Sequence, residues 1–505
     1  MRLSHYCCIL KALAAFMIIA TIAQAQKADS PRQKQHRYKV IDLSTLGGPI
    51  SYGSVNGDGF RLLNDSGSVA SYADLAVSDP NASFFCYDLD CYQAHATVWK
   101  HGEISDLGAL AGNNNSAAGS INSRGWATGQ SQSSTIDPAL GIPEFHATLW
   151  KHEKIVDLGT LGDGTESLGI FVNDAGQAVG FSTINTEPDP VGFAGFPTHT
   201  FIWRDGQKVD IGTLGGNDTF PGASCSHPPE GMVWGSSTTS TATNSDTGIP
   251  TVDPYIWDHG KMTDLGTLGG TNGFVQCVNS WHEAIGMSNL AGDITSHAFL
   301  WRNGRMKDLG TLGGDDSEAI WMNDAGVIAG SADLPTPGIH DAVRWKDGHI
   351  LDLGTVDGDP CSRGRAINAK GQIVGGSSDC SNFLHAFVWE EGGPMHDLNQ
   401  LIRPGSGLQL TNAFNINDQG EILAKSVPLG VAPIDDEDLG HLVLLVPCDE
   451  EGENCETVLR NAGPNQSPAD VVHEHLGERT AGDPLRTLRG RLAARRRTSI
   501  NSETR

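Results

Sequence analysis

The feature of this chain that most constrains its fold is a short motif that recurs eight times. The motif reads DLGTLGG at 264–270 and 308–314, and looser copies begin at positions 42, 106, 157, 210, 352 and 397. The later copies start about 44 residues apart, whereas longer insertions separate the earlier ones. Such internal self-similarity indicates a repeat architecture, in which each unit buries its apolar faces against its neighbours.

Each unit contains four short stretches that are typical of β-strands. In the sixth unit these stretches are 317–323, 327–331, 341–345 and 349–355. The first two are joined by a tight turn that ends in Gly326, a residue able to adopt the positive φ that such turns require. Four short strands in about 44 residues match one blade of a β-propeller.

The two ends of the repeat region complement each other. The eighth unit supplies three strands and ends near Pro447, whereas a fourth-strand sequence at 38–46 precedes the first unit. Pairing 38–46 with 441–446 would complete the last sheet and remove an open edge. We therefore predict an all-β fold, a β-propeller of eight four-stranded blades over 38–447, closed by the N-terminal strand. Seven blades with one degenerate unit, and an open solenoid, are the alternatives.

Two further signatures recur at fixed places in the units. The first hairpin carries Asn-x-x-Gly, beginning at Asn64, Asn122, Asn173, Asn323, Asn368 and Asn417. The fifth unit keeps Asn279 but has His282 where the others have Gly, and the fourth unit has lost the motif. The third strand ends in Trp in seven units, at Trp99, Trp150, Trp203, Trp257, Trp301, Trp345 and Trp389.

The motifs follow one another in a constant order. DLGTLGG precedes Ile-Asn-x-x-Gly, which precedes His-Ala-Phe-x-Trp, complete at 297–301 and 385–389. In this combination the chain resembles the HAF-repeat family of bacterial extracellular proteins over about 38–447. The resemblance implies secretion and a repeat architecture, but it brings no established activity and assigns no catalytic residue.

The repeated His, Asp and Trp residues are predicted to be structural. Six His occupy one repeated slot, which Asp253 and Asp341 fill in two other units. Equivalent slots of different blades lie too far apart to share one metal ion, so we predict neither a metal nor a cofactor. We expect each His to bond a neighbouring loop or Asp, and the Asp that opens each DLGTLGG copy to accept backbone N–H groups at a turn. The Trp side chains are predicted to lie in the core.

The ends of the chain differ from the repeats. Residues 1–25 combine positive charge, a short apolar run and a small-residue site ending at Ala25, which together predict a secretory signal peptide. A linker at 26–37 would follow, and 448–505 would form a tail, disordered after a small disulfide loop. We expect a secreted mature chain, extracellular or periplasmic, without a transmembrane segment, since no other apolar run is long enough to span a bilayer.

Eight cysteines remain once Cys7 and Cys8 leave with the signal peptide. An even number of cysteines in an oxidising compartment favours disulfides, and no Cys-x-x-Cys or His pair suggests metal binding. Proximity in sequence and matching places on adjacent strands predict four pairs: Cys86–Cys91, Cys225–Cys277, Cys361–Cys380 and Cys448–Cys455.

The connections between second and third strands vary most along the chain. They are long in the first four units, at 71–93, 132–145, 183–198 and 237–252, and would form a wall on one face of a propeller. The candidate ligand-binding residues on these loops are Phe84, Phe85, Tyr87, Asp88, Asp90, Tyr92, Phe193 and Phe196. Surface decoration without a binding role is the alternative.

The formal net charge of −26 argues against nucleic-acid binding, which needs a basic footprint. No catalytic motif stands out in the sequence. We therefore predict a secreted, non-enzymatic, monomeric repeat protein that binds a glycan or protein through the long-loop face of repeats one to four. A secreted carbohydrate-active hydrolase or lyase on a propeller scaffold, and a structural or adhesive surface protein, are the alternatives.

Overall fold

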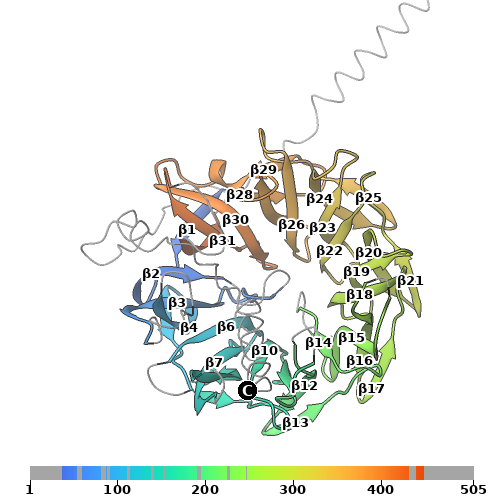
Figure 1. Cartoon of the computed structure of the whole chain (residues 1–505). Coiled ribbons are helices and arrows are strands. Elements are labelled where there is room, and N and C mark those ends of the chain that lie inside the picture. The colour runs from blue at the N-terminus through green and yellow to red at the C-terminus, as the bar shows by residue number, and fades with distance from the viewer. Residues whose placement is uncertain are drawn as a thin grey trace, which may run out of the picture. The chain divides into compact units, whose positions relative to one another are not determined.

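The computed structural model describes residues 37–53, 60–80, 87, 91–110, 114–137, 141–152, 154–189, 195–223, 228–245, 247–431 and 440–448. Within these residues the chain is almost entirely β-structure, with one 3₁₀ helix, η1 (Leu398–Gln400). The sheets of this region follow one another in chain order around a common centre (Figure 1). This arrangement of antiparallel sheets is that of a β-propeller.

Each repeat forms four antiparallel strands, and the repeats are numbered here as units. Unit one is β2 (Gly47–Tyr52), β3 (Val69–Ser78), β4 (Tyr92–Lys100) and β5 (Glu103–Asp106). Unit two is β6 (Ser116–Ile121), β7 (Ala127–Ile136), β8 (Pro143–Lys151) and β9 (Lys154–Asp157). Unit three is β10 (Ser167–Val172), β11 (Ala178–Thr183), β12 (Thr198–Arg204) and β13 (Gln207–Asp210).

Units six and seven keep the same order. Unit six is β22 (Ser317–Met322), β23 (Ile328–Asp333), β24 (His340–Lys346) and β25 (His349–Asp352). Unit seven is β26 (Cys361–Ile367), β27 (Ile373–Ser378), β28 (Phe383–Trp389) and β29 (Met395–Asp397).

Unit eight takes its outermost strand from the start of the chain, as the sequence predicts. Its own strands are β30 (Leu408–Ile416), β31 (Ile422–Pro428) and β32 (His441–Pro447), and β1 (Tyr38–Asp42) pairs antiparallel with β32. The register runs from Tyr38 opposite Pro447 to Asp42 opposite Val443.

Units four and five share one eight-stranded sheet. Unit four is β14 (Thr219–Pro221), β15 (Met232–Thr243), β16 (Pro250–Asp258) and β17 (Lys261–Asp264). Unit five is β18 (Gly269–Val278), β19 (Ala284–Leu290), β20 (Ser296–Arg302) and β21 (Arg305–Asp308). A parallel pairing of Val252 with Asn272 joins them, whereas the strands inside each unit are antiparallel.

The Asn of the first hairpin links consecutive units. Its Oδ1 accepts N–H groups of its own turn, as Asn368 does from Lys370 and Gln372. Its Nδ2 donates to the backbone carbonyl of the same Asn in the next unit. This bond runs from Asn323 to Asn368 (2.9 Å), Asn368 to Asn417 (3.0 Å), Asn417 to Asn64 (3.1 Å), Asn64 to Asn122 (2.9 Å) and Asn122 to Asn173 (2.9 Å).

A second seam joins the third strand of one unit to the first strand of the next. The Ser317 hydroxyl accepts the Ala298 N–H, and Ser362 accepts the Ala342 N–H. The same bond recurs at Ser116, Ser167 and Thr219. Because these side chains are buried, each bond satisfies a backbone donor that would otherwise be costly to bury.

The repeated Trp side chains pack as the sequence predicts, with two departures. Five are buried between sheets, at Trp99, Trp150, Trp203, Trp345 and Trp389. Trp257 and Trp301, in units four and five, are only half-buried. The buried Trp234 of unit four stacks on Phe171 of unit three, and its Nε1 donates to the carbonyls of Ala223 and Gln276.

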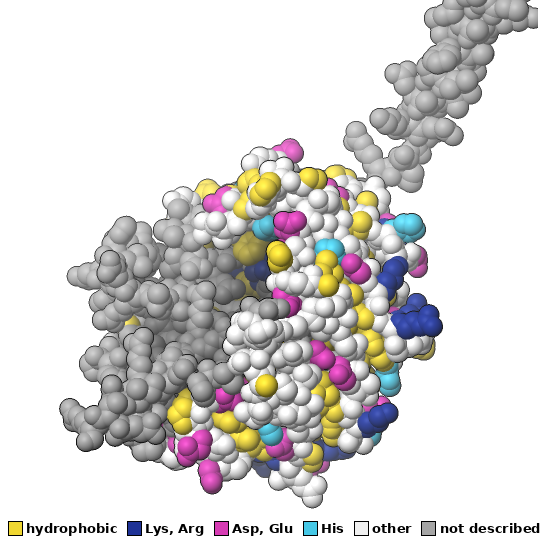
Figure 2. Space-filling model, turned by 45° about the vertical axis from the view of Figure 1, so that its right-hand side comes forward, with side chains coloured by type: hydrophobic (Ala, Val, Ile, Leu, Met, Phe, Trp, Pro, Cys, Tyr) yellow, Lys and Arg dark blue, Asp and Glu magenta, His cyan; other side chains and the backbone are white. Residues whose placement is uncertain are grey.

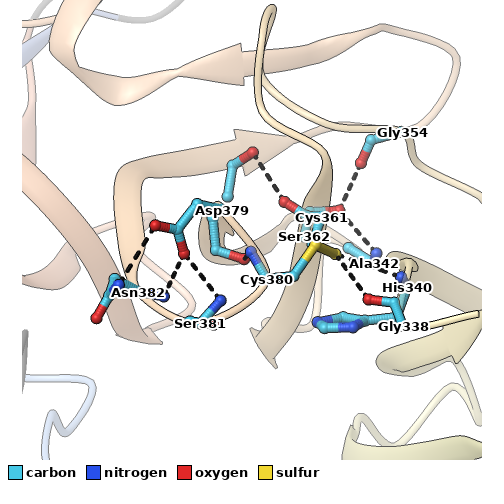
Figure 3. Close-up of a disulfide and its surroundings, with 12 residues drawn as sticks. Gly338, His340, Ala342, Gly354, Cys361, Ser362, Asp379, Cys380, Ser381 and Asn382 are labelled. Carbon is cyan, nitrogen blue, oxygen red and sulfur yellow. Dashed lines mark hydrogen bonds between the residues drawn. A yellow bond between two sulfur atoms is a disulfide. The ribbon is translucent and has the colours of Figure 1, made fainter.

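The Cys361–Cys380 disulfide predicted from the sequence is present (Figure 3). Cys361 opens β26 and Cys380 lies just beyond β27, with Cα atoms 5.1 Å apart, so the bond closes the open end of this hairpin. The Asp379 carboxylate beside it accepts the N–H groups of Ser381 and Asn382. Cys86, Cys225 and Cys455 lie outside the described residues, so the other three pairs stay predictions.

A search of the described residues finds no helix long and apolar enough to cross a membrane.

Candidate functional site

The connections between second and third strands in units one to four gather at one end of the strands. In an antiparallel sheet these connections share an end with the links between units, while the other two turns lie opposite. The strands extend further than predicted, so the loops are shorter than the sequence suggested, at 79–91, 137–142, 184–197 and 244–249. We call this end the loop face.

Each long loop is closed at its base by a backbone hydrogen bond. The N–H of Asp79 donates to the Cys91 carbonyl, Asp137 to Ile142, Ile184 to Pro197 and Asn244 to Ile249, over 2.8 to 3.0 Å. Inside the third loop Asp189 also donates to the Gly195 carbonyl. The three aspartates are at least 94% buried. An Asp or Asn at such a position accepts nearby N–H groups and so stabilises the start of a loop.

Loop one is also tied to unit two. The Asp79 carboxylate accepts the N–H of Tyr87 and the Nδ2 of Asn115, at 3.2 and 2.8 Å. The Tyr87 ring packs on Tyr72 and Phe145, and its hydroxyl accepts Nε2 of Gln130 at 2.8 Å. The loop thus rests on a packed layer that spans two units.

The candidate ligand-binding residues divide into three groups. Phe84, Phe85, Asp88, Asp90 and Phe193 lie outside the described residues. Tyr87 and Phe196 are each only 2% exposed, so their side chains support the loops and do not face solvent. Tyr92 is half-buried at the start of β4, opposite Ser78.

The loop face instead exposes aliphatic side chains that sequence reasoning missed. They stand at connections between second and third strands and are between 42% and 91% exposed: Val77, Ile136, Ile249, Ile294 and Leu429. Other exposed aliphatic side chains, Ile155, Val209 and Leu351, lie on outermost strands. Figure 2 shows hydrophobic side chains interspersed with charged ones over the described surface on view.

The repeated His residues bind Asp, as the sequence predicts. Nδ1 lies within 3.0 Å of the strand-four carboxylate in His95–Asp106, His146–Asp157, His199–Asp210 and His297–Asp308, and His441 binds Asp42 of β1 in the same way. His385 instead binds Asp359, and the strand-four Asp397 of this unit caps η1. Each Asp also accepts a turn N–H, as Asp106 does from Gly108.

These contacts set the charge state of the pairs. Burial raises the pKa of Asp106, but the bonds from His95 and Gly108 outweigh it and hold the pKa below its ordinary value. Burial lowers the pKa of His146, but Asp157 and Glu144 outweigh it and leave the pKa raised. Both shifts favour the ion pair.

Where Asp replaces His, two carboxyl groups face each other. Burial, followed by the charge of Asp264, raises the pKa of Asp253 to about 6. Burial, followed by the charge of Asp352, raises the pKa of Asp341 to about 7. Asp264 and Asp352 are exposed, so each carboxyl pair has one member open to solvent. Among the described residues no cluster of three or more His, Cys, Asp or Glu could hold a metal ion.

No family model matches the chain, and no curated protein matches it either. Among solved structures it is similar to an acylaminoacyl peptidase from Pyrococcus horikoshii, at 11% identity over 74% of this chain and 58% of that one, with a TM-score of 0.37. It is similar to the β-propeller domain of the Trilobed protease from Pyrococcus furiosus, at 10% identity over 73% of this chain and 100% of that one, with a TM-score of 0.36.

A third similarity is to dipeptidyl peptidase 4 from Porphyromonas gingivalis, at 9% identity over 76% of this chain and 60% of that one, with a TM-score of 0.42. The chain therefore spans less than two thirds of the length of both peptidases. At these scores its function has to be argued from its own residues.

Proposed function

We propose that the chain is a secreted, closed eight-bladed propeller of the HAF-repeat type that binds a protein ligand through the loop face, without catalysis. Three contacts support closure between unit eight and the start of the chain. They are the pairing of β1 with β32, the bond from Asn417 Nδ2 to the Asn64 carbonyl, and the bond from Asn415 Nδ2 to the Phe60 carbonyl. Counting the shared sheet as two blades gives eight.

The observation that carries the binding proposal is the set of exposed aliphatic side chains on anchored loops. Val77 and Ile136 lie at the ends of β3 and β7, where two of the long loops begin, and Ile249 closes a third, and these loop bases are fixed by backbone bonds. Side chains held at fixed strand ends lose little entropy on binding, and exposed aliphatic groups gain free energy when a partner removes them from water. A protein surface suits such contacts better than a glycan, which needs aromatic platforms and many polar partners.

The test is a triple variant, Val77→Ser, Ile136→Ser and Ile249→Ser. The control is Val209→Ser with Leu351→Ser, which removes equally exposed aliphatic groups from outermost strands. Both proteins would be screened against a displayed peptide library selected on the wild type and against a glycan array. We expect at least tenfold weaker peptide binding for the triple variant alone. Equal peptide binding by both variants would refute a protein-binding loop face. So would glycan binding by the wild type that the triple variant loses.

A further inference from the structure

The turn between β18 and β19 in unit five departs from every other Asn-x-x-Gly turn at two successive positions, Trp281 and His282, and the Glu283 that follows has a counterpart in Glu421 of unit eight. Trp281, His282 and Glu283 stand where unit six has Ala325, Gly326 and Val327. The backbone nevertheless keeps the common geometry. The His282 N–H donates to the Asn279 carbonyl, and Asn279 Oδ1 accepts the N–H groups of Trp281 and Glu283.

His282 therefore adopts a conformation that favours glycine. Its φ is 62°, while the glycines at this place in six other units have φ between 71° and 88°. A non-glycine residue there costs about 1–2 kcal/mol. Six units have Gly at this place, so His282 departs from its own repeat position, although His101, His152 and His259 also have positive φ in the turns between third and fourth strands. Such a departure is a reason to look for a function at this turn.

The three side chains line a hollow of about 410 Å³, together with Trp301, Arg302 and Asn303. Trp281 is 73% exposed, and its Nε1 donates to the Asp324 carbonyl at 3.1 Å, which fixes the plane of the indole. Glu283 is held from two sides, by Arg302 Nε at 2.6 Å and by Asn279 Nδ2 at 2.9 Å. The hollow thus combines an oriented, open aromatic ring with fixed polar groups.

We propose that this hollow is a second ligand site, which binds neutral pyranose glycans. It lies at the strand ends opposite the loop face, because the turns between first and second and between third and fourth strands share that end. The apolar C–H face of a pyranose would stack on the Trp281 indole. Sugar hydroxyls would bond His282, Asn303 and the free N–H groups of Arg302, whose side chain is 66% exposed.

The charges at the hollow select the class of ligand. Glu283 already neutralises Arg302, so neither charge is left to attract an ionised ligand. A cationic ligand on the Trp281 face would find no open carboxylate to pair with, because both oxygens of Glu283 are already bound, to Arg302 and to Asn279. Anionic polymers are repelled by the net charge of −26 at low salt. A neutral sugar meets none of these penalties.

The experiment titrates the purified protein with cellohexaose, xylohexaose, mannohexaose and chitohexaose, read by intrinsic tryptophan fluorescence and calorimetry. Polygalacturonate oligomers serve as the anionic probe. We expect at least one neutral oligosaccharide to bind. We expect Trp281→Ala to weaken it at least tenfold without loss of the folded state, since the ring is exposed. Ile294→Ala, on the loop face of the same unit, is the matched control and should bind as the wild type does.

His282→Gly separates a binding role from a structural one. It should raise the midpoint of thermal unfolding by removing the strained φ, yet weaken sugar binding several-fold. Absence of binding by all neutral probes at millimolar concentration, preference for polygalacturonate, or unchanged affinity in Trp281→Ala would overturn the proposal. None of these results bears on peptide binding at the loop face, so the two proposals fail separately.

Discussion

Units six, seven, eight and one are joined differently from units four and five. In the first group each sheet is separate, and the hairpin Asn donates to the backbone of the next unit at every step from Asn323 to Asn122. In units four and five the sheets merge through Val252 and Asn272. Unit four has no Asn at the hairpin, and Asn279 of unit five donates to Glu283 of its own turn.

The difference shows that units six, seven, eight and one are linked by the same Asn-to-carbonyl bond at every step, whereas units four and five are linked by contacts that do not recur in the other units. Trp345 and Trp389, in units six and seven, are buried, whereas Trp257 and Trp301, in units four and five, are only half-buried. The buried Trp of unit four is Trp234, on the second strand. Units four and five depart from the repeat in sequence and carry side chains that the other units lack. The hollow beside Trp281 lies in unit five.

The largest expected effect tests the packing. Trp345→Ala should lower the free energy of unfolding by about 3–5 kcal/mol, because it removes a fully buried ring and its bond from Nε1 to the Leu309 carbonyl. Trp257→Ala should cost about half as much, since part of that ring is already in water. Urea unfolding followed by circular dichroism measures both. Equal losses would mean that the two sides are packed alike.

A smaller effect tests the bonds between units. Asn368→Ala removes the bond to the Asn417 carbonyl and three bonds within its own turn, and should cost about 2–3 kcal/mol. Asn173→Ala is the matched variant beside unit four, where Nδ2 donates only to Gln177 of its own turn. We expect it to cost about 1 kcal/mol. If urea unfolding shows that Asn173→Ala costs more free energy than Asn368→Ala, the Asn bonds between units do not stabilise the fold as proposed.

The smallest effect concerns pH. The pKa of Asp341 is raised to about 7 in the folded protein, so between pH 4 and pH 7 the folded state binds more protons than the unfolded state. Stability should therefore fall as the pH rises through this range, by about 1 kcal/mol after screening at the exposed Asp352. Asp341→Asn should remove this slope and raise the thermal midpoint more at pH 8 than at pH 5.

Asp253→Asn is the companion variant for this measurement. It should act in the same direction, but its transition should lie lower, because the pKa of Asp253 is raised to about 6. If the thermal midpoint of either variant changes with pH as the wild-type midpoint does, the carboxyl pairs do not control the pH dependence of stability.

The sequence predicts those features that arise within one unit or repeat between units. Four of the His–Asp pairs join adjacent strands of one hairpin, and the Cys361–Cys380 bond closes one hairpin, so these contacts are local in sequence. The pairing of β1 with β32 follows from the missing fourth strand of the last unit. Trp burial follows from alternation along the third strand.

What the sequence does not predict depends on contacts between different units. The burial of Tyr87 needs Phe145 and Gln130 of unit two, and the joined sheet of units four and five rests on a single pairing at Val252. The departure of His282 from the repeat was visible in the sequence. The hollow beside this turn could not be predicted from the sequence, because only the structure shows that Trp281 stays exposed beside the Glu283–Arg302 pair.

The borrowed strand β1 has a consequence for the order of folding. His441 and Asp42 are 399 residues apart, and this contact forms only after almost the whole repeat region has left the ribosome. Neighbouring hairpins need no such wait, since local contacts form fast and distant ones slowly. Until that moment β32 and β1 each present an unsatisfied edge, so the nascent chain is most vulnerable to mispairing with another copy just before its synthesis ends.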